Sequence, residues 1–227
     1  LTLALGIGAN SAIFSVVNGV LLESLPYRSA HRLYQPRMLY PDGTKYDALS
    51  GPDFMRVKVA QRVFDQVEAT NVVNVTLLGA GEPREVSAAM VTGGLFDMLG
   101  LNVSLGRAFR PEENQTGRNH VAILSDGFWR RAFGGDPNVL GKTITASGNA
   151  CTIVGVASPG TSLPDAVDVF FPQEYGPTFD SNTQRGRRSE FLNVYARVKQ
   201  GIDPVAVDAD LKRMGSDLQK WFNPTND

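Results

Sequence analysis

The chain begins with a mostly apolar segment. No charged residue occurs from Leu1 to Leu22. As a helix rising about 1.5 Å per residue, this segment is about 33 Å long, enough to cross the roughly 30 Å hydrocarbon core of a bilayer. A buried helix of a water-soluble domain is the alternative, because Asn10 and Asn18 interrupt the apolar run. We expect a membrane helix and its exit over residues 1–27, with one face of small residues that lets helices approach closely, formed by Gly8, Ala12, Ser15 and Gly19.

Four later segments have the spacing of amphipathic helices. The apolar positions predict helices over residues 50–69, 92–99 and 126–133, and a last helix over 203–222. Their ends carry the expected signals: a cap at Ser125 or Asp126, Gly100 as a stop, and Asp203 followed by Pro204 as a start. In the first of these helices the shared apolar face is predicted to contain Phe54, Val57, Ala60, Phe64 and Val67.

Alternating apolar and polar positions predict strands between these helices. Two of them, in residues 70–91, are joined at "GAGEP", and a second hairpin over residues 142–157 turns at Gly148-Asn149. Single strands are expected around "RLYQPRM", "HVAILS", "AVDVFFP" and "FLNVYARVK". The order βαββα, then a β-rich middle, then βα predicts an α+β fold with an inserted lobe around residues 104–187.

Composition narrows the range of functions. The 227 residues include 22 Lys and Arg against 23 Asp and Glu, so the chain lacks the broad basic field that nucleic-acid binding needs. One cysteine, Cys151, cannot form an internal disulfide or a cysteine-rich metal site, and its alternating surroundings predict a buried structural thiol. We therefore expect no nucleic-acid partner and no metal site.

The stretch "GGDPNVLGKT", residues 134–143, comes close to a phosphate-binding P-loop. The first glycine of the G-x-x-x-x-G-K-[ST] pattern should fall at position 136, where the chain has Asp136. Its negative charge and the missing N–H of Pro137 both oppose phosphate binding. A P-loop also follows a strand and opens a helix, whereas here a helix precedes and a strand follows. The pattern favours a helix stop, a loop and a strand.

Enzyme chemistry has only weak candidates. "GTSLP" resembles a nucleophile elbow in its first three positions, but Pro164 replaces the final glycine. A nucleophilic Ser162 would need His31 or His120 as its base, and nothing in the sequence places either nearby. Asp165 and Asp168 as a carboxylate pair are better explained as residues that cap a strand or face water. We expect no catalytic and no cofactor-binding residue.

A binding module is a further possibility. Residues 173–190 are polar, and within them Arg185, Arg187 and Arg188 form a compact basic run. Such a run can contact anionic lipid headgroups or an acidic partner. The alternative, which the composition favours, is a solvated loop.

The order of several motifs resembles MacB-type ABC transporter permeases, in the wider FtsX-like group. These motifs are "LALGIGANSAIFSVVNGVLLESLPY", "GGLFDMLGLNVSLGRAFRPEE", "VAILSDGFWRRAFGGDPNVLGKTI", "TIVGVA", "VFFP" and "FLNVYARVKQGIDP", and together they span nearly the whole chain. The resemblance implies a membrane helix over 1–27 and an α+β domain of two lobes. A Porter-like lobe would comprise 28–103 and 188–227, and an inserted, β-rich Sabre-like lobe 104–187.

The same resemblance implies a location and partners. It places the protein in the cell inner membrane, with residues 28–227 in the periplasm and further membrane helices after the last amphipathic helix. ATP would be bound by a separate ABC ATPase subunit or domain, so no cofactor is expected in this chain. The permease would form a homodimer or pseudo-dimer and contact a periplasmic adaptor or lipoprotein. The expected function is transmission of ATP-driven motion across the membrane; the alternatives are a regulatory, partner-binding ectodomain and, third, an extracytoplasmic hydrolase.

Overall fold

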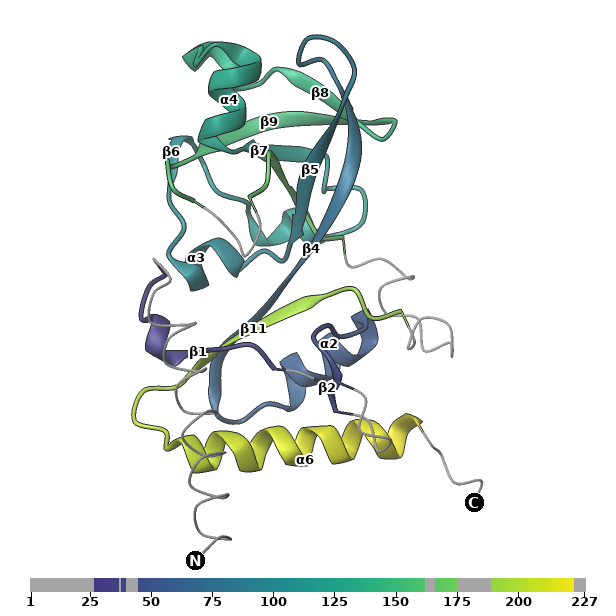
Figure 1. Cartoon of the computed structure of the whole chain (residues 1–227), viewed down its shortest axis with the longest axis vertical. Coiled ribbons are helices and arrows are strands. Elements are labelled where there is room, and N and C mark those ends of the chain that lie inside the picture. The colour runs from purple at the N-terminus through teal and green to yellow at the C-terminus, as the bar shows by residue number, and fades with distance from the viewer. Residues whose placement is uncertain (1–26, 37, 40–44, 162–165, 175–188, 223–227) are drawn as a thin grey trace, which may run out of the picture.

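A computed structural model describes residues 27–36, 38–39, 45–161, 166–174 and 189–222 of the chain (Figure 1). Nine strands form one sheet in the order β1-β11-β4-β5-β10-β7-β9-β6, and β8 pairs with both β4 and β9. A separate pair is formed by β2 and β3. The strands are β1 (Leu33–Tyr34), β2 (Met38–Leu39), β3 (Lys45–Tyr46), β4 (Phe64–Leu78), β5 (Arg84–Val91), β6 (Val103–Gly106), β7 (Val121–Leu124), β8 (Thr143–Ala146), β9 (Asn149–Ala157), β10 (Val169–Pro172) and β11 (Asn193–Val198).

Helices accompany the sheet, and together they confirm the predicted α+β class. The helical elements are the α-helices α2 (Gly51–Ala60), α3 (Leu95–Leu99), α4 (Asp126–Phe133) and α6 (Pro204–Phe222), with the 3₁₀ turns η1 (Ala30–Arg32), η2 (Pro111–Asn114) and η3 (Pro137–Val139). Several predicted ends are confirmed. Ser125 Oγ accepts a hydrogen bond from Phe128 N–H, Asp203 Oδ1 accepts one from Val205 N–H, and Gly100 closes α3 in a left-handed conformation.

Six strands close into a barrel. The ring runs β4-β5-β10-β7-β9-β8 and returns to β4 through the pairing of Leu77 with Ala146. Because side chains alternate along each strand, one set points inward and the other outward. The inward set forms one apolar cluster with Phe128 of α4 and Val139 of η3. The barrel strands contribute to its buried core Leu77, Val86, Ala88, Ala122, Leu124, Ile144, Ala146, Cys151, Ile153, Val156, Val169 and Phe171.

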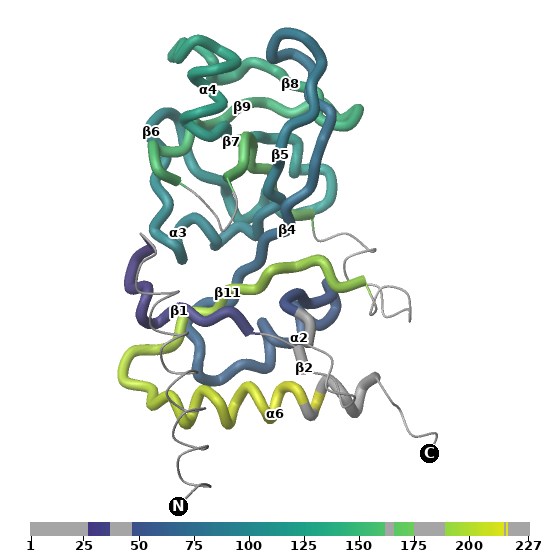
Figure 2. The backbone as a smooth tube through the Cα atoms, viewed as in Figure 1, coloured from purple at the N-terminus to yellow at the C-terminus, as the bar shows by residue number. Residues whose placement is uncertain are grey.

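Strand β4 is shared between the barrel and a smaller part of the sheet. Residues 64–70 pair with β11, and residues 70–77 pair with β5. A strand of 15 residues spans about 50 Å at about 3.3 Å per residue. Figure 2 shows the backbone of β4 running from the region above α6 up into the barrel. One continuous strand therefore joins both parts of the molecule.

Helices α2 and α6 cover one face of the smaller part, formed by β4 and β11 (Figure 1). Their apolar residues make a second cluster with these strands, including Phe54 of α2, Val67 of β4 and Met214 of α6. A third cluster fills the space between the smaller part and the outside of the barrel, where α3 and Phe170 of β10 meet Tyr195 of β11. Three adjoining apolar clusters thus form the core of the described part of the chain.

Two sequence predictions were wrong in detail. The helix expected over residues 50–69 ends at Ala60, and Phe64 begins β4. A bulge opposite Arg197 and Val198 lets Phe64 and Val67 both enter the apolar cluster beneath the helices, so the strand shows a helix-like spacing of three. The second hairpin turns at Ser147-Gly148, one residue before the predicted pair, and both residues have positive φ.

Candidate functional site

Most residues singled out from the sequence lie outside the described ranges. The small-residue face of Gly8, Ala12, Ser15 and Gly19, the basic run of Arg185, Arg187 and Arg188, and Ser162 with Asp165 all belong to this group. Asp168 is described, and its carboxylate is 2.6 Å from the Arg131 guanidinium. Among the described residues, no helix is long and apolar enough to cross a membrane.

The stretch 134–143 has the predicted order of helix, loop and strand. Asp136 caps η3 by accepting a hydrogen bond from Asn138 N–H, and its other carboxylate oxygen lies 2.9 Å from Lys142 Nζ. The Trp129 indole donates to the Asp136 carbonyl. Hydrogen bonds from Lys142 and Asn138 hold the pKa of Asp136 below its usual value. The lysine that would reach a phosphate in a P-loop is therefore neutralised by an aspartate of the same loop.

A cluster of polar side chains lies where β4 leaves β11 and joins β5. Glu68, which is 7% exposed, accepts hydrogen bonds from Thr92 Oγ1 and, at 3.0 Å, from Lys58 Nζ of α2. Thr92 Oγ1 also accepts from Ala69 N–H at 2.9 Å. The Glu68 carboxylate thus connects helix α2 with the residue that follows β5. We call Lys58, Glu68, Thr92 and Arg197, described next, the coupling junction.

Arg197 is the second buried charge of the coupling junction. It lies on β11 at 6% exposure, and its guanidinium donates to the carbonyl oxygens of Met98 in α3 and, at 3.5 Å, Ser29. Burial lowers the pKa of Arg197, and the nearby cations Arg32 and Arg28 lower it further. One side chain thereby joins the small part of the sheet to α3 and to the segment around η1.

The glycines before α3 allow a close approach at this place. A Cβ on Gly94 would lie 2.5 Å from a carboxylate oxygen of Glu68, and a Cβ on Gly93 would clash with Oδ1 of Asn114. Asn114 is itself buried and donates to the carbonyls of Val91 and Gln173. Glycine at positions 93 and 94 therefore leaves room for the Asn114 and Glu68 side chains at the start of α3.

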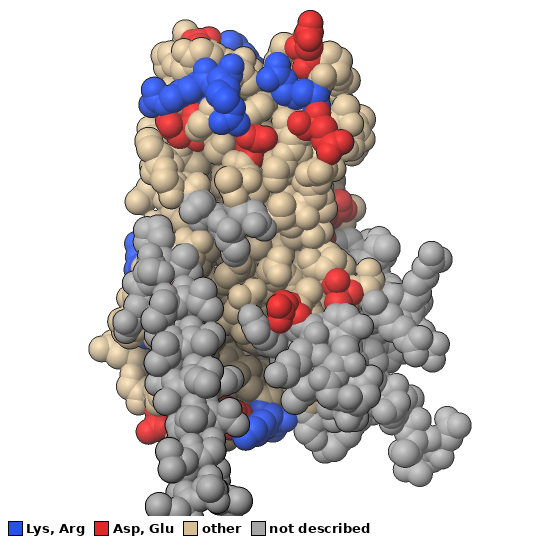
Figure 3. Space-filling model, in the orientation of Figure 1, with Lys and Arg blue, Asp and Glu red and all other residues tan. Residues whose placement is uncertain are grey.

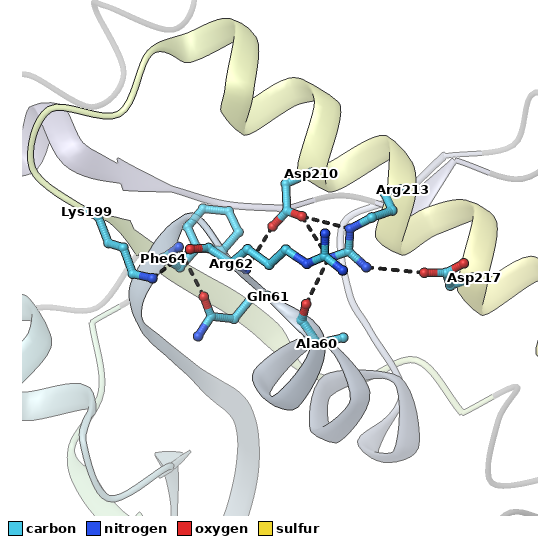
Figure 4. A network of polar contacts seen from close by, with 8 residues as sticks. All are labelled: Ala60, Gln61, Arg62, Phe64, Lys199, Asp210, Arg213 and Asp217. Carbon is cyan, nitrogen blue, oxygen red and sulfur yellow. Dashed lines mark hydrogen bonds and ion pairs between the residues drawn. The ribbon is translucent and has the colours of Figure 1, made fainter.

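Helix α6 is attached to the small part of the sheet by a second polar network, which we call the helix clamp (Figure 4). Asp210, 7% exposed, accepts from Arg62 N–H at 3.0 Å and from Arg213 at 2.7 Å. Arg213 also donates to the Ala60 carbonyl at 2.8 Å. The helix clamp thus fixes α6 to the connection between α2 and β4.

In the helix clamp, the negative charge of Asp210 is stabilised by its hydrogen-bond donors. Burial by itself would raise the pKa of Asp210, but hydrogen bonds from Arg62 N–H and the Arg213 guanidinium outweigh it, and the pKa lies below its usual value. A carboxylate with a lowered pKa is one that the folded state prefers charged. The clamp therefore strengthens as Asp210 ionises.

These residues were not identified from the sequence, although two of them carry a signal. Asp210 is three residues after Val207 and four before Met214, so it falls on the apolar stripe of its helix. Glu68 interrupts a strand of buried residues in the same way. A charge on a buried face requires a buried partner, and that requirement could have marked both positions. Arg213 is only three residues from Asp210, but the other partners, Lys58, Thr92 and Arg62, are 10 to 148 residues away in sequence, which no local pattern reveals.

Charges on the visible face gather at one end of the molecule, around α4 and the connection between β4 and β5 (Figure 3). The middle of that face is largely uncharged. Arg130 pairs with Asp126 and Arg131 with Asp168, so the cations of α4 are matched by acids. Within the described ranges, no three His, Cys, Asp or Glu side chains gather where they could hold a metal ion.

Three solved structures of permease or transporter domains have a similar fold. A domain of a protein described as a permease from Porphyromonas gingivalis is 18% identical, with 84% of this chain and 86% of that one covered and a TM-score of 0.65. The periplasmic region of MacB from Actinobacillus actinomycetemcomitans is 14% identical, with 82% of each chain covered and a TM-score of 0.61. The extracellular domain of the noncanonic ABC-type transporter YknZ from Gram-positive bacteria is 20% identical, with 82% and 92% covered and a TM-score of 0.59.

Comparison with curated protein sequences finds no match. The family model for the MacB-like periplasmic core domain, in contrast, matches residues 1–214. This match covers nearly the whole chain, and the structural likeness extends over the same α+β domain. The resemblance noted in the sequence motifs is thereby confirmed: the chain belongs to the family of MacB-like periplasmic core domains found in ABC transporter permeases.

Proposed function

We propose that residues 28–227 form the extracytoplasmic domain of a permease subunit and transmit motion driven by cytoplasmic ATP hydrolysis to a cargo or partner outside the inner membrane. In this proposal the chain is not an enzyme and binds no cofactor. ATP binds to an ABC ATPase subunit or domain, and two permease copies, or two related halves, work as a pair. The predicted Sabre-like lobe, residues 104–187, would supply β7, β8, β9 and β10 of the barrel. Strands β4 and β5 of the barrel lie within residues 28–103, which were predicted as part of the Porter-like lobe, so the barrel does not coincide with the inserted lobe.

The proposal rests on a continuous series of contacts between described residues that connects α6 to the barrel. We call this series of contacts the load path. The helix clamp ties α6 to the residues before β4, β4 continues into the barrel, and the coupling junction ties α2 and β11 to the α3 side. Buried, charge-assisted hydrogen bonds resist reorientation better than exposed ion pairs do. A displacement of α6 would therefore move the barrel as well.

Location is tested first, with a reporter that is active only outside the cytoplasm, fused after Asn223 in the full-length protein. We expect activity. An inactive reporter on a stably expressed fusion would place the domain in the cytoplasm and refute the proposed transmission across the membrane.

Transmission itself is tested by distance measurements on the complete permease and its ATPase in lipid nanodiscs. Spin labels are placed at Glu82, on the exposed connection between β4 and β5, and at Val205, which is 75% exposed at the start of α6. Native cysteines of the permease and its ATPase, Cys151 among them, are first replaced by Ala. With one doubly labelled copy per pair, we expect the distance between the two sites to stay constant during ATP turnover. With one label per copy, distances between copies should change.

The two measurements separate the alternatives. If distances between copies are the same with and without ATP, the domain transmits no motion, and a regulatory, partner-binding ectodomain becomes the better description. If the distance within one copy changes, motion occurs but the load path through the coupling junction is not rigid.

A further inference from the structure

The barrel is plugged at one end and hollow at the other. At the plugged end, Phe128 of α4 and Val139 of η3 join the inward-facing side chains. At the other end β5, β8 and β10 finish, and β7 and β9 begin. Figure 1 shows the turn between β8 and β9 on the side of the barrel away from α4. A cavity of about 510 Å³ opens at this end, which we call the barrel mouth.

The floor and the rim of the barrel mouth differ in chemistry. Its floor is apolar, because the inward-facing positions of the strands continue to their ends; it comprises Val73, Val75, Met90, Ala146, Cys151 and Phe171. Its rim is polar and includes Asn119, His120, Asn149 and Glu174. A concave, mostly apolar cavity with a few convergent polar groups, in the mouth of a β-barrel, is a typical small-molecule site, and this volume is within the usual range of about 300–1,000 Å³.

The carboxylate of Glu174 makes the rim favour a positively charged group on a ligand. Its carboxylate accepts a hydrogen bond from Asn119 Nδ2 at 3.1 Å, and no described cation is paired with it. Asn119 is neutral, so the negative charge of Glu174 is not compensated within the part of the chain that the structure describes. No Lys or Arg lines the cavity. A ligand with an apolar body and a positively charged amine would satisfy both the floor and the rim.

We infer that the barrel mouth binds a small amphiphile that carries a primary amine, with its apolar body on the floor and its ammonium group at Glu174. The inference rests on the barrel alone and is independent of the proposed transmission of motion. It gives the barrel a role that the load path does not require: recognition of a ligand outside the membrane.

The only cysteine of the chain provides a direct readout, because Cys151 lies in the floor of the barrel mouth. The full chain is treated with methyl methanethiosulfonate at fixed pH, and modification of Cys151 is followed by intact mass spectrometry. The burial that raises the pKa of this thiol keeps its basal reaction slow enough to time. Three probes share an eight-carbon chain and differ in charge: octylamine, octan-1-ol and octanoate.

We expect octylamine to slow the modification, octan-1-ol to do so only at about tenfold higher concentration, and octanoate to be the weakest, since a charge-assisted hydrogen bond is stronger than a neutral one. In Glu174→Gln, octylamine should lose its advantage over octan-1-ol. The native chain and the Glu174→Gln variant are compared in the same detergent, so each probe partitions into micelles to the same extent in both experiments.

A pair of variants on one strand tests the place of binding. Val75→Trp fills the mouth and should abolish protection by octylamine, whereas Leu78→Trp, on the 42% exposed side chain of the same strand, should leave protection unchanged. Unchanged modification rates with all three probes would overturn the inference, and so would protection that persists in Val75→Trp. Protection by octanoate equal to that by octylamine would overturn the assignment to an amine.

Discussion

The barrel interior and the coupling junction are both buried, but different side chains fill them. In the barrel, the inward positions are apolar on every strand, and Leu124, Ile144 and Ile153 are fully buried. In the coupling junction, Glu68 and Arg197 are buried together with Thr92, and each is held by specific hydrogen bonds. Apolar packing depends on volume and tolerates small rotations, whereas a buried charge is stable in only one arrangement of its partners. The barrel is thus built for stability and the junction for a fixed orientation.

The largest expected effect is in the barrel. Ile153→Ala should lower the free energy of unfolding by about 2–5 kcal/mol, because it removes a fully buried branched side chain and leaves a cavity. Urea unfolding followed by circular dichroism measures the change. Val59→Ala, at an 82% exposed position of α2, is the control and should stay within about 0.5 kcal/mol of the native chain. Equal losses for both variants would mean that the barrel interior is not closely packed.

The contrast between the barrel interior and the coupling junction also explains which features could be predicted from the sequence. The barrel strands were found because their alternation is local, and the caps at Ser125 and Asp203 because capping needs only neighbouring residues. Closure of the barrel was not predicted, since it depends on the pairing of Leu77 with Ala146, 69 positions away. No periodicity encodes which strand is adjacent at that distance.

The coupling junction was beyond sequence reasoning for a related physical reason. The hydrogen bond from Arg197 to Met98 joins residues 99 positions apart, and the one from Thr92 to Glu68 joins residues 24 positions apart. Charge alone cannot locate such partners, because most Arg and Asp residues lie at the surface. The bulge in β4 misled the helix prediction in the same way, because its cause is the partner strand β11.

The second prediction separates stability from orientation within the junction. Arg197→Met keeps most of the side-chain volume but leaves the Met98 and Ser29 carbonyls without their donor, so we expect a loss of about 1–3 kcal/mol. In the labelled permease, the distance between Glu82 and Val205 within one copy should also become broader. Arg197→Lys restores the charge without the planar fork and should give an intermediate width. A loss of stability with an unchanged distance distribution would show that Arg197 contributes packing and not orientation.

The third prediction concerns the pH dependence of the helix clamp. The pKa of Asp210 is lower in the folded state than in the unfolded state, so its stabilisation is complete above the unfolded value, about 3.9, and is lost as the pH falls through the folded pKa. Asp210→Asn should therefore cost about 1–3 kcal/mol at pH 7, and the difference from the native chain should shrink below about pH 4. Unfolding at several pH values measures both.

A matched control is available on the same helix. Asp208 is 63% exposed and pairs with Lys212 one turn later, so Asp208→Asn should change stability by less than about 0.5 kcal/mol at any pH. If Asp208→Asn and Asp210→Asn behaved alike, the helix clamp would be no stronger than an ordinary surface pair.

The smallest effect is expected on the outside of the barrel, where charges are numerous but exposed. The Arg131 guanidinium lies 2.6 Å from Asp168, as close as the pairs of the helix clamp, yet its side chain is 64% exposed. Water screens such a pair and the long side chain loses entropy in forming it, so Arg131→Ala should cost no more than about 1 kcal/mol, and less at high salt. Unfolding in 0.05 M and 1 M NaCl provides the comparison with Asp210→Asn, whose cost should persist in salt because Asp210 itself is buried. Should Arg131→Ala prove the more costly of the two, distance rather than burial would set the strength of the ion pairs, and the distinction between the exterior of the barrel and the polar networks would fail.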